Sequence, residues 1–596
     1  MAKGSSLFSS MTLSPKRWRV APRAPSSYRS QFSDLPPLLA QVLYNRDVRD
    51  VAAVTDFLKS DGEEANAFAL PGMHTAVTRI RAALRREERI AVYGDFDADG
   101  ITATALLVQT LQALDANVQP YIPDRVDEGY GLNDGALDAL GANGVSLVVT
   151  VDCGSRASDA IAHAGQQGLD IVVTDHHSLG SPLPDAVAVV NPRRALDRRG
   201  GSHDPRLDTL SGVGVAYQLA RALLLSQRQS PVTQRDVSLQ AEDLLDLVAL
   251  GTVADVVPLR GENRILVQRG LERLNGMARP GVKALCEVAR LRPGKVDATA
   301  IGYILGPRLN AAGRLGDAML ALRLLLTEDE TEARGLAREL DSLNRERQRL
   351  TGQACDLARK LALEADGEPL LLFAASREFL PGIVGLVAGR LLDEFYRPTV
   401  VVEIGEEISR GSCRSIPEFH ITRALDDCEG LLQRHGGHAA AAGFRVANEN
   451  LDRLTERLRG LAVEELSDQD LTPTLDIDAE VALSEMSWEL QQALLHLEPC
   501  GCKNPRPLFA SRGVPVRSYR AVGREGKHLK LRLSDGRLTW DAIAFRQGEW
   551  AGRLPDLVDV VYHLEVNEWN GRRQLQLNVQ DIRPATATAE IQEGAG

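Results

Sequence analysis

Acidic residues directly follow short apolar stretches at four places in this chain, and this arrangement constrains its fold more than any other feature. The first is the segment 94–100, Gly-Asp-Phe-Asp-Ala-Asp-Gly, which follows Ile90–Tyr93 and carries carboxylates on alternate residues. The others are 151–154 (Val-Asp-Cys-Gly), 175–177 (Asp-His-His) and 254–255 (Ala-Asp). Such segments predict one metal site assembled from the ends of strands or helices.

Between residues 89 and 191, short apolar stretches alternate with longer segments of helical character. The expected strands and intervening helices are, in chain order, 90–92, 102–114, 118–122, 134–140, 147–151, 158–167 and 171–174. This alternation predicts a parallel sheet with helices on both faces. Sites in such sheets form at the carboxyl ends of the strands, which is where the acidic segments fall.

The residue types in these segments favour a hard divalent cation. Carboxylates with one or two imidazoles suit Mg²⁺ or Mn²⁺, whereas thiolate-rich sets select zinc. Of the seven cysteines only Cys500 and Cys502 lie close together, without the second pair of a zinc ribbon. Alternating aspartates before a glycine could form a plain turn. However, carboxylates packed this closely repel one another, and a bound cation relieves the repulsion.

The tandem histidines allow a more specific assignment. A lone histidine is usually a hydrogen-bonded group without a ligand role, but here two histidines follow Asp175 after an apolar stretch. Neighbours in an extended segment point to opposite sides, so we expect only one imidazole to reach the metal site. We assign His176 to the metal and His177 to a substrate phosphate.

A chain of 596 residues is too long for one core and predicts about three or four domains. Residues 212–326 are expected to be helical, with amphipathic runs such as Leu244–Leu250, and a charged segment after them predicts long solvent-bridging helices. Ala510–Ile582 alternates β-like runs with turn signals, which is typical of a small closed barrel. The expected divisions are a basic extension at 1–45, domains at 46–326, 369–466 and 467–585, a connecting helix at 327–368, and a tail at 586–596.

Charge is unevenly distributed along the chain. The net charge of −12 would ordinarily disfavour a nucleic-acid partner. Between Lys503 and Arg573, however, the chain contains fourteen lysines and arginines and eight acidic residues, so this stretch carries a net charge of +6. Aromatic residues such as Tyr519 and Phe545 are interleaved with the basic ones. Proteins that bind single strands combine a basic groove with aromatic platforms, although some of these aromatics must fill the barrel core.

The N-terminal stretch is basic. Its first acidic residue is Asp34, which six lysines and arginines precede among many serines. We interpret the stretch as a tail that touches a phosphate backbone or nothing at all, with an organelle transit peptide as the minor alternative. No apolar run approaches the roughly 18 residues that cross a bilayer. The odd number of cysteines and the lack of a secretory signal predict a reducing, intracellular compartment.

Taken in order, the acidic motifs resemble those of the DHH phosphoesterase superfamily and, within it, those of the RecJ family of bacterial single-strand-specific exonucleases. The motif at Asp255 continues as Ala-Asp-Val-Val-Pro-Leu. The resemblance extends from Lys16 onward. It includes further motifs at 123–125 (Pro-Asp-Arg), 129–131 (Gly-Tyr-Gly), 307–314 (Pro-Arg-Leu-Asn-Ala-Ala-Gly-Arg), 411–415 (Gly-Ser-Cys-Arg-Ser) and 437–444 (Gly-His-Ala-Ala-Ala-Ala-Gly-Phe).

The resemblance implies an α/β fold: a parallel-sheet DHH domain and a smaller α/β DHH-associated domain joined by a long helix, followed by a C-terminal β-barrel of the OB type. It also implies two divalent cations, Mn²⁺ or Mg²⁺, with Asp152 bridging them. The implied metal ligands are Asp95, Asp97, Asp152, His176 and Asp255. Asp97, Asp152 and His177 are expected to take part directly in the reaction. Asp99 is not a first-choice ligand.

The resemblance further implies a pocket for a terminal 5′-phosphate. By position its residues are Ser412 and Arg414, with Arg125 and Arg314 on nearby phosphates and His438, in a glycine-rich loop, as a further substrate contact. Arginine suits this task because its planar fork offers paired donors to two oxygens. Without the resemblance, Ser412 and Arg414 would be read as a turn with a solvated arginine, Arg314 as a surface residue, and His438 as a packing histidine.

These features lead us to expect a metal-dependent exonuclease that degrades single-stranded DNA from the 5′ end in DNA repair and recombination. The direction comes from the resemblance, as do the bacterial cytoplasm or nucleoid as its location and a single-strand-binding protein and a helicase as possible partners. One alternative is a DHH phosphodiesterase acting on short oligonucleotides or cyclic dinucleotides. Another is a catalytically silent DNA-binding scaffold, against which the complete set of mutually repelling ligands argues.

Two segments depart from the family pattern. Where RecJ-like chains usually carry Trp-His before the Gly-Val-Ile-Gly motif, this chain has Phe379 and Leu380, and where they usually carry Gly-Asn-Pro it has Lys503-Asn-Pro. Neither segment contains a predicted metal ligand. We therefore expect these departures to affect substrate contacts and domain packing rather than hydrolysis.

Overall fold

The computed structural model describes residues 16–59, 62–125, 127–196, 204–233, 235–364, 369–569 and 571–585. The described residues divide into two compact units. The first comprises the described parts of 1–59, 470–498 and 505–596, and the second those of 60–469 and 499–504. Within the described residues, every helix is too short or too polar to pass through a bilayer.

The second unit begins with a five-stranded, entirely parallel sheet in the order β3-β2-β4-β5-β6. Its strands are β2 (Arg89–Tyr93), β3 (Val118–Tyr121), β4 (Val145–Val151), β5 (Asp170–Thr174) and β6 (Ala188–Val190). The central strands are buried almost throughout, as expected of a parallel sheet covered on both faces. The predicted strand and helix alternation is confirmed here.

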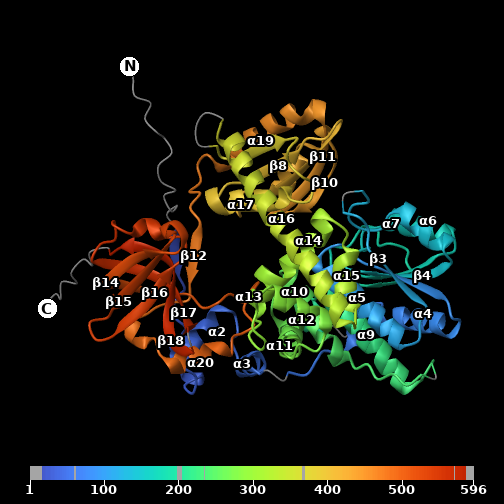
Figure 1. Ribbon diagram of the computed structural model, residues 1–596, viewed down its shortest axis with the longest axis horizontal. Coiled ribbons are helices and arrows are strands. Elements are labelled where there is room, and N and C mark those ends of the chain that lie inside the picture. Colours follow the sequence, from blue (N-terminus) through green and yellow to red (C-terminus); the bar gives the residue numbers. More distant parts are fainter. Residues whose placement is uncertain are drawn as a thin grey trace. The chain divides into compact units, whose positions relative to one another are not determined.

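Helices cover both faces of this sheet (Figure 1). One face packs against α4 (Met73–Arg85), α5 (Ala98–Ala113) and α9 (Gly212–Gln229), and the other against α6 (Asp134–Ala142) and α7 (Ser158–Gln166). All four predicted metal-site segments lie on this unit, three at the carboxyl ends of β2, β4 and β5 and one at the end of α10 (Leu245–Ala254).

Helices follow the sheet, as the sequence predicts for 212–326. They are, after α9 and α10, α11 (Gly261–Asn275), α12 (Pro280–Val288), α13 (Ala298–Ala300), the π-helix η4 (Ile301–Leu305), α14 (Gly306–Leu315) and α15 (Met319–Leu326). The expected amphipathic character of Leu244–Leu250 is wrong. Every residue of α10 from Leu245 to Thr252 is buried, because α5, α9 and α11 all pack around this helix.

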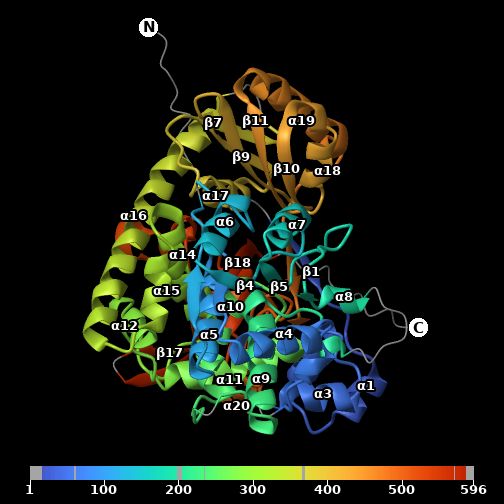
Figure 2. The ribbon, with the colours of Figure 1, turned by 90° about the vertical axis from the view of Figure 1, so that its right-hand side faces the viewer.

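One long helix, α16 (Glu330–Leu363), lies within the expected connector, whose last residues, 365–368, are outside the described part of the chain. Figure 2 shows it running from α12 to β7. It is not solvent-bridging as predicted. A stripe of buried residues, among them Ala337, Leu340 and Ala358, packs against α12, α14, β7 and α17. The helix therefore connects the two α/β parts of the unit along a continuous packed face.

A mixed five-stranded sheet follows, in the order β10-β11-β9-β8-β7. Its elements are β7 (Leu372–Ser376), α17 (Val384–Phe395), β8 (Thr399–Glu403), β9 (Ile408–Arg414), α18 (Ile421–Asp426), β10 (Leu432–His438), β11 (Ala441–Ala447) and α19 (Leu451–Leu466). The segment of His438, expected as a glycine-rich loop, is the end of a strand, and so is the segment that carries Ser412 and Arg414. Gly411 to Arg414 end β9, and Gly436 to His438 end β10, because both pair with β11 along their length.

The first unit contains the predicted closed barrel. Strands β14 (Phe509–Val522), β15 (His528–Ser534), β16 (Thr539–Ala544), β18 (Arg572–Pro584) and β17 (Leu557–Trp569) pair in that order, and β14 with β17 closes the ring. The barrel is preceded by β12 (Thr474–Ile477), β13 (Ala479–Glu480) and α20 (Trp488–Leu495). The tail at 586–596 lies outside the described residues.

The expected basic extension at 1–45 is not a tail over its described part. Residues 16–59 form β1 (Arg17–Val20), α1 (Ser26–Gln31), α2 (Pro37–Asn45) and α3 (Val51–Leu58), and they belong to the barrel unit, so the expected division at residue 46 differs from the observed one. Strand β1 pairs in parallel with β12, and Trp18 donates its indole N–H to Asp581 at 2.6 Å. Residues 1–15, on which the transit-peptide alternative also depends, lie outside the described residues.

Candidate metal centre

The first acidic segment forms a turn from the end of β2 into α5. Helix α5 begins at Ala98, earlier than expected, because Asp97 is its N-cap and accepts hydrogen bonds from the backbone N–H groups of Asp99 and Gly100. Such capping satisfies N–H groups that have no partner inside the helix. A Cβ at Gly100 would lie 2.5 Å from the Asp95 carbonyl oxygen, so the turn closes tightly only with glycine there.

Asp99 anchors another helix. Its carboxylate accepts hydrogen bonds from the backbone N–H groups of Gly212 at 2.6 Å and Val213 at 2.9 Å, at the start of α9. A carboxylate at a helix N-terminus is favoured by the helix dipole. Burial and the neighbouring Asp97 carboxylate raise the pKa of Asp99 to about 7, against the effect of these two hydrogen bonds. Both carboxylate oxygens of Asp99 thus have backbone partners, but one of them also lies within 4.8 Å of ligand atoms of His176 and Asp255, so Asp99 is a further potential ligand.

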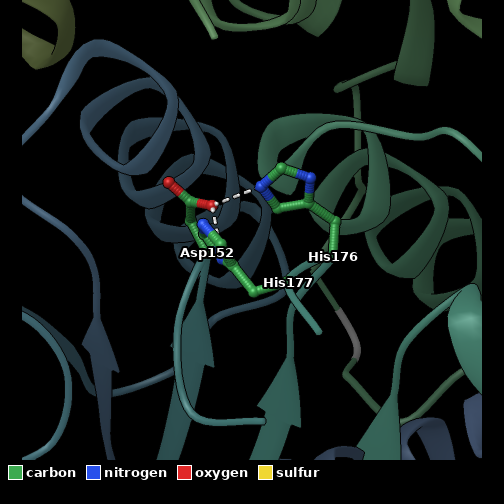
Figure 3. Close-up of side chains that lie close together, drawn as sticks. All are labelled: Asp152, His176 and His177. Carbon is green, nitrogen blue, oxygen red and sulfur yellow. Dashed lines mark ion pairs between the residues drawn. The ribbon is translucent and has the colours of Figure 1, made fainter. Parts of the chain in front are cut away.

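The remaining acidic and imidazole groups converge on one another. Figure 3 shows the imidazoles of His176 and His177 directed at the carboxylate of Asp152. Asp152 Oδ1 lies 3.1 Å from His176 Nε2, and that nitrogen lies 3.6 Å from Asp255 Oδ2. In addition, one oxygen each of Asp95, Asp97 and Asp152 lie within 4.8 Å of one another. Asp152 is therefore common to two groups of potential ligands.

A divalent cation fits these donors. Among the buried atoms of the described residues that have no hydrogen-bond partner, four belong to this site, namely Asp95 Oδ1, Asp152 Oδ1, His176 Nε2 and Asp255 Oδ2. A buried polar atom without a partner is costly and unusual in folded proteins. Carboxylate oxygens with one imidazole are the ligands that Mn²⁺ and Mg²⁺ accept. All four atoms belong to residues predicted as metal ligands from the sequence.

The pKa values of these groups are shifted in the way expected of a metal site without its cation. Burial, followed by repulsion from Asp99 and other nearby carboxylates, raises the pKa of Asp255 to about 9 and that of Asp152 well above its ordinary value. Burial and Asp97 likewise raise the pKa of Asp95. Burial, and then the charge of His177, lowers the pKa of His176 to about 4. His176 is thus neutral at pH 7, as a ligand must be, and a bound cation would compensate the carboxylate repulsion.

The expectation that the two histidines point to opposite sides is wrong. Strand β5 ends at Thr174, and the carboxylate of Asp175 accepts hydrogen bonds from the backbone N–H groups of His176 at 2.7 Å and His177 at 3.1 Å. This local turn brings both rings to one side, so that His177 Nδ1 lies 3.8 Å from Asp152 Oδ1.

Asp175 is a residue of the site that sequence reasoning missed, although it stands in the motif. Its Oδ1 lies 2.8 Å from His177 Nδ1, and its Oδ2 accepts a hydrogen bond from Ser155 N–H at 2.9 Å. Burial would raise the pKa of Asp175, but the hydrogen bond and charge of His177 outweigh burial and lower it to about 2. Asp175 therefore stays ionised and fixes the ring of His177.

Sequence reasoning also missed Tyr130. Its hydroxyl lies 3.0 Å from His177 Nδ1 and 3.2 Å from the carbonyl oxygen of Asp152. The signal was available in the Gly-Tyr-Gly motif, because Gly129 and Gly131 adopt φ angles of +82° and +91°, which glycine tolerates at little cost. These two glycines turn the loop so that the tyrosine reaches the histidine.

Four of the five predicted substrate contacts lie together. Arg125 is stacked 4.2 Å from the ring of Phe96. Ser412 and Arg414, two residues apart on β9, share one face, with a guanidinium nitrogen of Arg414 3.3 Å from Ser412 Oγ. Arg314 donates to the carbonyl oxygen of Gly382 at 2.9 Å. Burial, followed by repulsion from Arg125 and Arg347, lowers the pKa of Arg314 to about 9, and Arg414 adds to the repulsion. Buried like charges of this kind favour a bound anion.

His438 lies apart from this group. It ends β10, where it pairs with Ala441 of β11, and Ala441 pairs in turn with Arg414 of β9. One whole strand therefore separates His438 from Arg414, which places their backbones about 10 Å apart at the usual strand spacing. His438 is exposed, and its carbonyl oxygen accepts a hydrogen bond from the Thr422 hydroxyl at 2.7 Å.

The chain matches three family models over these parts: the DHH family, N-terminal domain, over residues 89–252, the DHHA1 domain over 369–464, and the RecJ OB domain over 477–581. It is 38% identical to the single-stranded-DNA-specific exonuclease RecJ of Salmonella typhimurium, over 93% of this chain and 96% of that protein. The chain belongs to the RecJ family. The predicted fold class, with an OB-type barrel, is thereby confirmed.

Solved RecJ structures extend the comparison. The RecJ of Thermus thermophilus in complex with Mn²⁺ aligns with a TM-score of 0.81 and 33% identity, over 96% of this chain and 80% of that chain. The same protein in complex with Mg²⁺ aligns with a TM-score of 0.76 and 32% identity, over 96% and 79%. These two ions are the ones that the donors of this site favour, so Mn²⁺ or Mg²⁺ is the cofactor of the fold.

Proposed function

We propose that this RecJ family member is a Mn²⁺- or Mg²⁺-dependent exonuclease that hydrolyses single-stranded DNA from the 5′ end and releases nucleotides during DNA repair and recombination. The observation that supports the proposal most is the set of four buried ligand atoms, from Asp95, Asp152, His176 and Asp255, that have no hydrogen-bond partner among the described residues. The barrel that matches the RecJ OB domain supports single-stranded DNA as the substrate.

In this proposal Asp95, Asp97, Asp152, His176 and Asp255 would hold two cations. Asp152 would be common to both ions, because it belongs to two groups of potential ligands, one with Asp95 and Asp97 and the other with His176 and His177. Two such ions supply an activated water and stabilise the entering and leaving oxygens of an in-line displacement. No protein nucleophile is then required. His176 contributes the lone pair of Nε2, which stays available because its pKa is about 4.

The other residues orient the substrate. His177, with its ring fixed by Asp175, holds a proton at Nδ1 and is placed to contact a phosphate beside the carboxylate of Asp152. The hydrogen bond to Asp175 raises the pKa of His177 against the effect of burial, which favours the form that donates to an anion. Arg125, Arg314, Ser412 and Arg414 would hold the terminal 5′-phosphate, which limits cleavage to chain ends. His438 remains a proposed contact further along the strand.

Duplex DNA should be a poor substrate, because separating the strands costs free energy that this chain has no visible means to supply. The sequence contains no Gly-x-x-x-x-Gly-Lys-Ser/Thr loop for ATP. We therefore also propose that a helicase and a single-strand-binding protein act with it, in the bacterial cytoplasm near the nucleoid. Co-purification with each partner from cells, with and without nuclease treatment, would test this association.

Digestion of a single-stranded oligonucleotide labelled at its 5′ or its 3′ end tests the activity. With Mn²⁺ or Mg²⁺ we expect immediate release of the 5′ label as mononucleotide and late loss of the 3′ label. EDTA and Asp152→Ala should abolish both. Asp138→Ala removes a carboxylate of α6 that pairs with His163 outside the metal centre, and this control should stay active.

The two alternatives give different results in the same assay. Intact DNA under every metal, together with salt-sensitive binding, would favour the catalytically silent scaffold. Cleavage of dinucleotides alone, retained after removal of the residues beyond about 470, would favour a small-substrate phosphodiesterase.

A further inference from the structure

Two side chains stand out among the exposed large hydrophobic residues in the described part of the chain. Tyr303 is 82% exposed and Val256 is 67% exposed, the two highest values among them. Single exposed apolar residues are common and need no explanation by themselves. Here, however, both residues lie at the same place in the fold.

That place is the end of α10, which carries Asp255. Val256 directly follows Asp255. Tyr303 lies between two glycines that approach the same helix end, since a Cβ at Gly302 would lie 3.9 Å from Val253 Cγ1 and one at Gly306 would lie 3.2 Å from Ala254 Cβ. Asp255 Oδ2 is in turn 3.6 Å from His176 Nε2. Both exposed side chains thus flank the helix end that contributes to the metal centre.

The helical segment of Tyr303 continues into the site. Helix η4 leads without interruption into α14, whose Asn310 accepts a hydrogen bond from Ala98 N–H in the acidic turn at 2.8 Å. Helix α14 also packs closely on this turn, since a Cβ at Gly313 would lie 2.6 Å from the carbonyl oxygen of Phe96. The next residue, Arg314, is one of the predicted phosphate contacts. Tyr303 precedes Asn310 by seven residues, which is about 10 Å along a helix. It therefore lies at the rim of the metal centre.

The backbone at both positions is unusual. Val256 has a φ angle of +62°, which is an outlier for a β-branched residue. Ile301–Leu305 forms a π-helix, a rare element that is frequent at functional sites. Strained conformations of this kind persist only where the surroundings enforce them, and they cluster at sites of function. Here the two deviations present an aromatic ring and an apolar side chain to solvent beside a metal ligand.

We propose that Tyr303, at the same helix end as the exposed Val256, is a base-stacking platform for the single-stranded substrate, at the rim of the metal centre. The face of an aromatic ring offers stacking area but no donor for a phosphate, so the matching part of the strand is a nucleobase. Stacking on aromatic residues tolerates any base, as an enzyme that digests arbitrary sequence requires. The proposal rests on the proposed function and adds a substrate-positioning residue to it.

A double-mutant cycle tests the platform, in which a change at Tyr303 is combined with removal of one base from the substrate. Wild type, Tyr303→Ala and Tyr303→Phe are compared on 5′-phosphorylated oligonucleotides, each with one abasic position moved stepwise from the 5′ end. On intact DNA, Tyr303→Ala should raise KM by about 5-fold to about 150-fold, the loss of one stacked base, with little change in kcat. Tyr303→Phe should stay within about twofold of wild type because it keeps the ring. Leu225→Ala, at an exposed apolar residue on α9, is the surface control.

The abasic series gives the decisive result. At one abasic position the wild type should lose affinity while Tyr303→Ala loses nothing further, because the same contact is already missing. An equal effect of Tyr303→Ala on every abasic oligonucleotide, or no effect on intact DNA, would overturn the platform. If the wild type proves inactive as a nuclease, the proposed function fails by itself. The platform is then decided by 2-aminopurine fluorescence during binding in EDTA, which the wild type should quench at one base position and the Tyr303→Ala variant should not.

Discussion

Asp152 combines two constraints at a single residue. Its φ angle of +62° lies in the left-handed region, which costs about 1 to 2 kcal/mol for most residues. Its carboxylate lies against the start of α9, where a Cβ at Gly212 would come within 2.5 Å of Oδ1. The strained turn after β4 therefore directs the carboxylate to a point where it belongs to two groups of potential ligands.

Asp152→Asn should separate the effect of this carboxylate on stability from its effect on hydrolysis. Asparagine tolerates the left-handed region better than most residues and carries no charge to repel Asp95, Asp97 and Asp255. We expect the variant to unfold at a higher temperature than the wild type in EDTA, yet to lose more than about a hundredfold in hydrolysis, since even residues that only orient metal ligands cost about 10- to 100-fold. Thermal unfolding with and without Mn²⁺ and release of 5′ label measure the two effects.

Lys503 is strained without a catalytic role. It has a φ angle of +56° and stands where RecJ-like chains usually carry glycine. Glycine adopts this conformation freely, but it loses more backbone entropy on folding. Lys503→Gly should therefore stabilise the protein by up to about 1 kcal/mol, with unchanged exonuclease activity. The melting temperature checks this, and Lys503→Ala, which keeps the strain, should give no gain.

Strand β9 presents Ser412 and Arg414 on one face, and at the scale of this element the terminal phosphate can be tested. Arg414→Ala should lower kcat/KM on a 5′-phosphorylated strand by about a hundredfold, in the range of about 2 to 3 kcal/mol for a lost charge-assisted contact. It should have far less effect on a strand with a 5′-hydroxyl. Arg434→Ala, on the exposed part of β10, is the matched control. Equal losses on both substrates would contradict a phosphate role.

Strand β1 is a second element whose function can be isolated. Trp18 hydrogen-bonds to Asp581, and the guanidinium carbon of Arg583 lies 4.2 Å from the centre of its ring. Trp18→Ala should destabilise the barrel unit by about 2 kcal/mol, less than the roughly 3–5 kcal/mol of a fully buried tryptophan. Amide exchange should accelerate in β12 and β18 and stay unchanged in β2 and β4. Uniform acceleration in both units would mean that β1 is not specific to the barrel.

At the scale of the whole molecule, the sequence predicted what short segments encode. The parallel sheet was predicted from the alternation of apolar and helical segments. The acidic motifs at the strand ends, to which the resemblance assigned the metal ligands, lie together as the topology requires. The orientation of His177 could not be predicted, because the contacts of Asp175 with the backbone N–H groups of both histidines and with the ring of His177 decide it. The fold of the N-terminal stretch could not be predicted either, since Trp18 and its partner Asp581 are 563 residues apart. Contacts over such separations leave no local pattern.

The pH dependence of stability arises from the carboxylates of the metal centre together. The slope of the melting temperature against pH should change sign when the cation binds. Burial and mutual repulsion raise the pKa of Asp255 to about 9 and that of Asp99 to about 7. Between the ordinary pKa of about 4 and these values, the folded state binds more protons than the unfolded state, so stability falls as pH rises. In EDTA the melting temperature should therefore drop from pH 6 to pH 9.

With saturating Mn²⁺ the trend should reverse, because the cation binds the ionised carboxylates and competes with protons. The melting temperature should then rise from pH 6 to pH 8, and the gain over EDTA should be largest at the highest pH. Asp255→Asn removes the carboxyl group whose pKa is raised to about 9 and should flatten the decline in EDTA. A melting temperature in EDTA that does not depend on pH over this range would show that the carboxylates of the metal centre are not held in their protonated forms when the cation is absent.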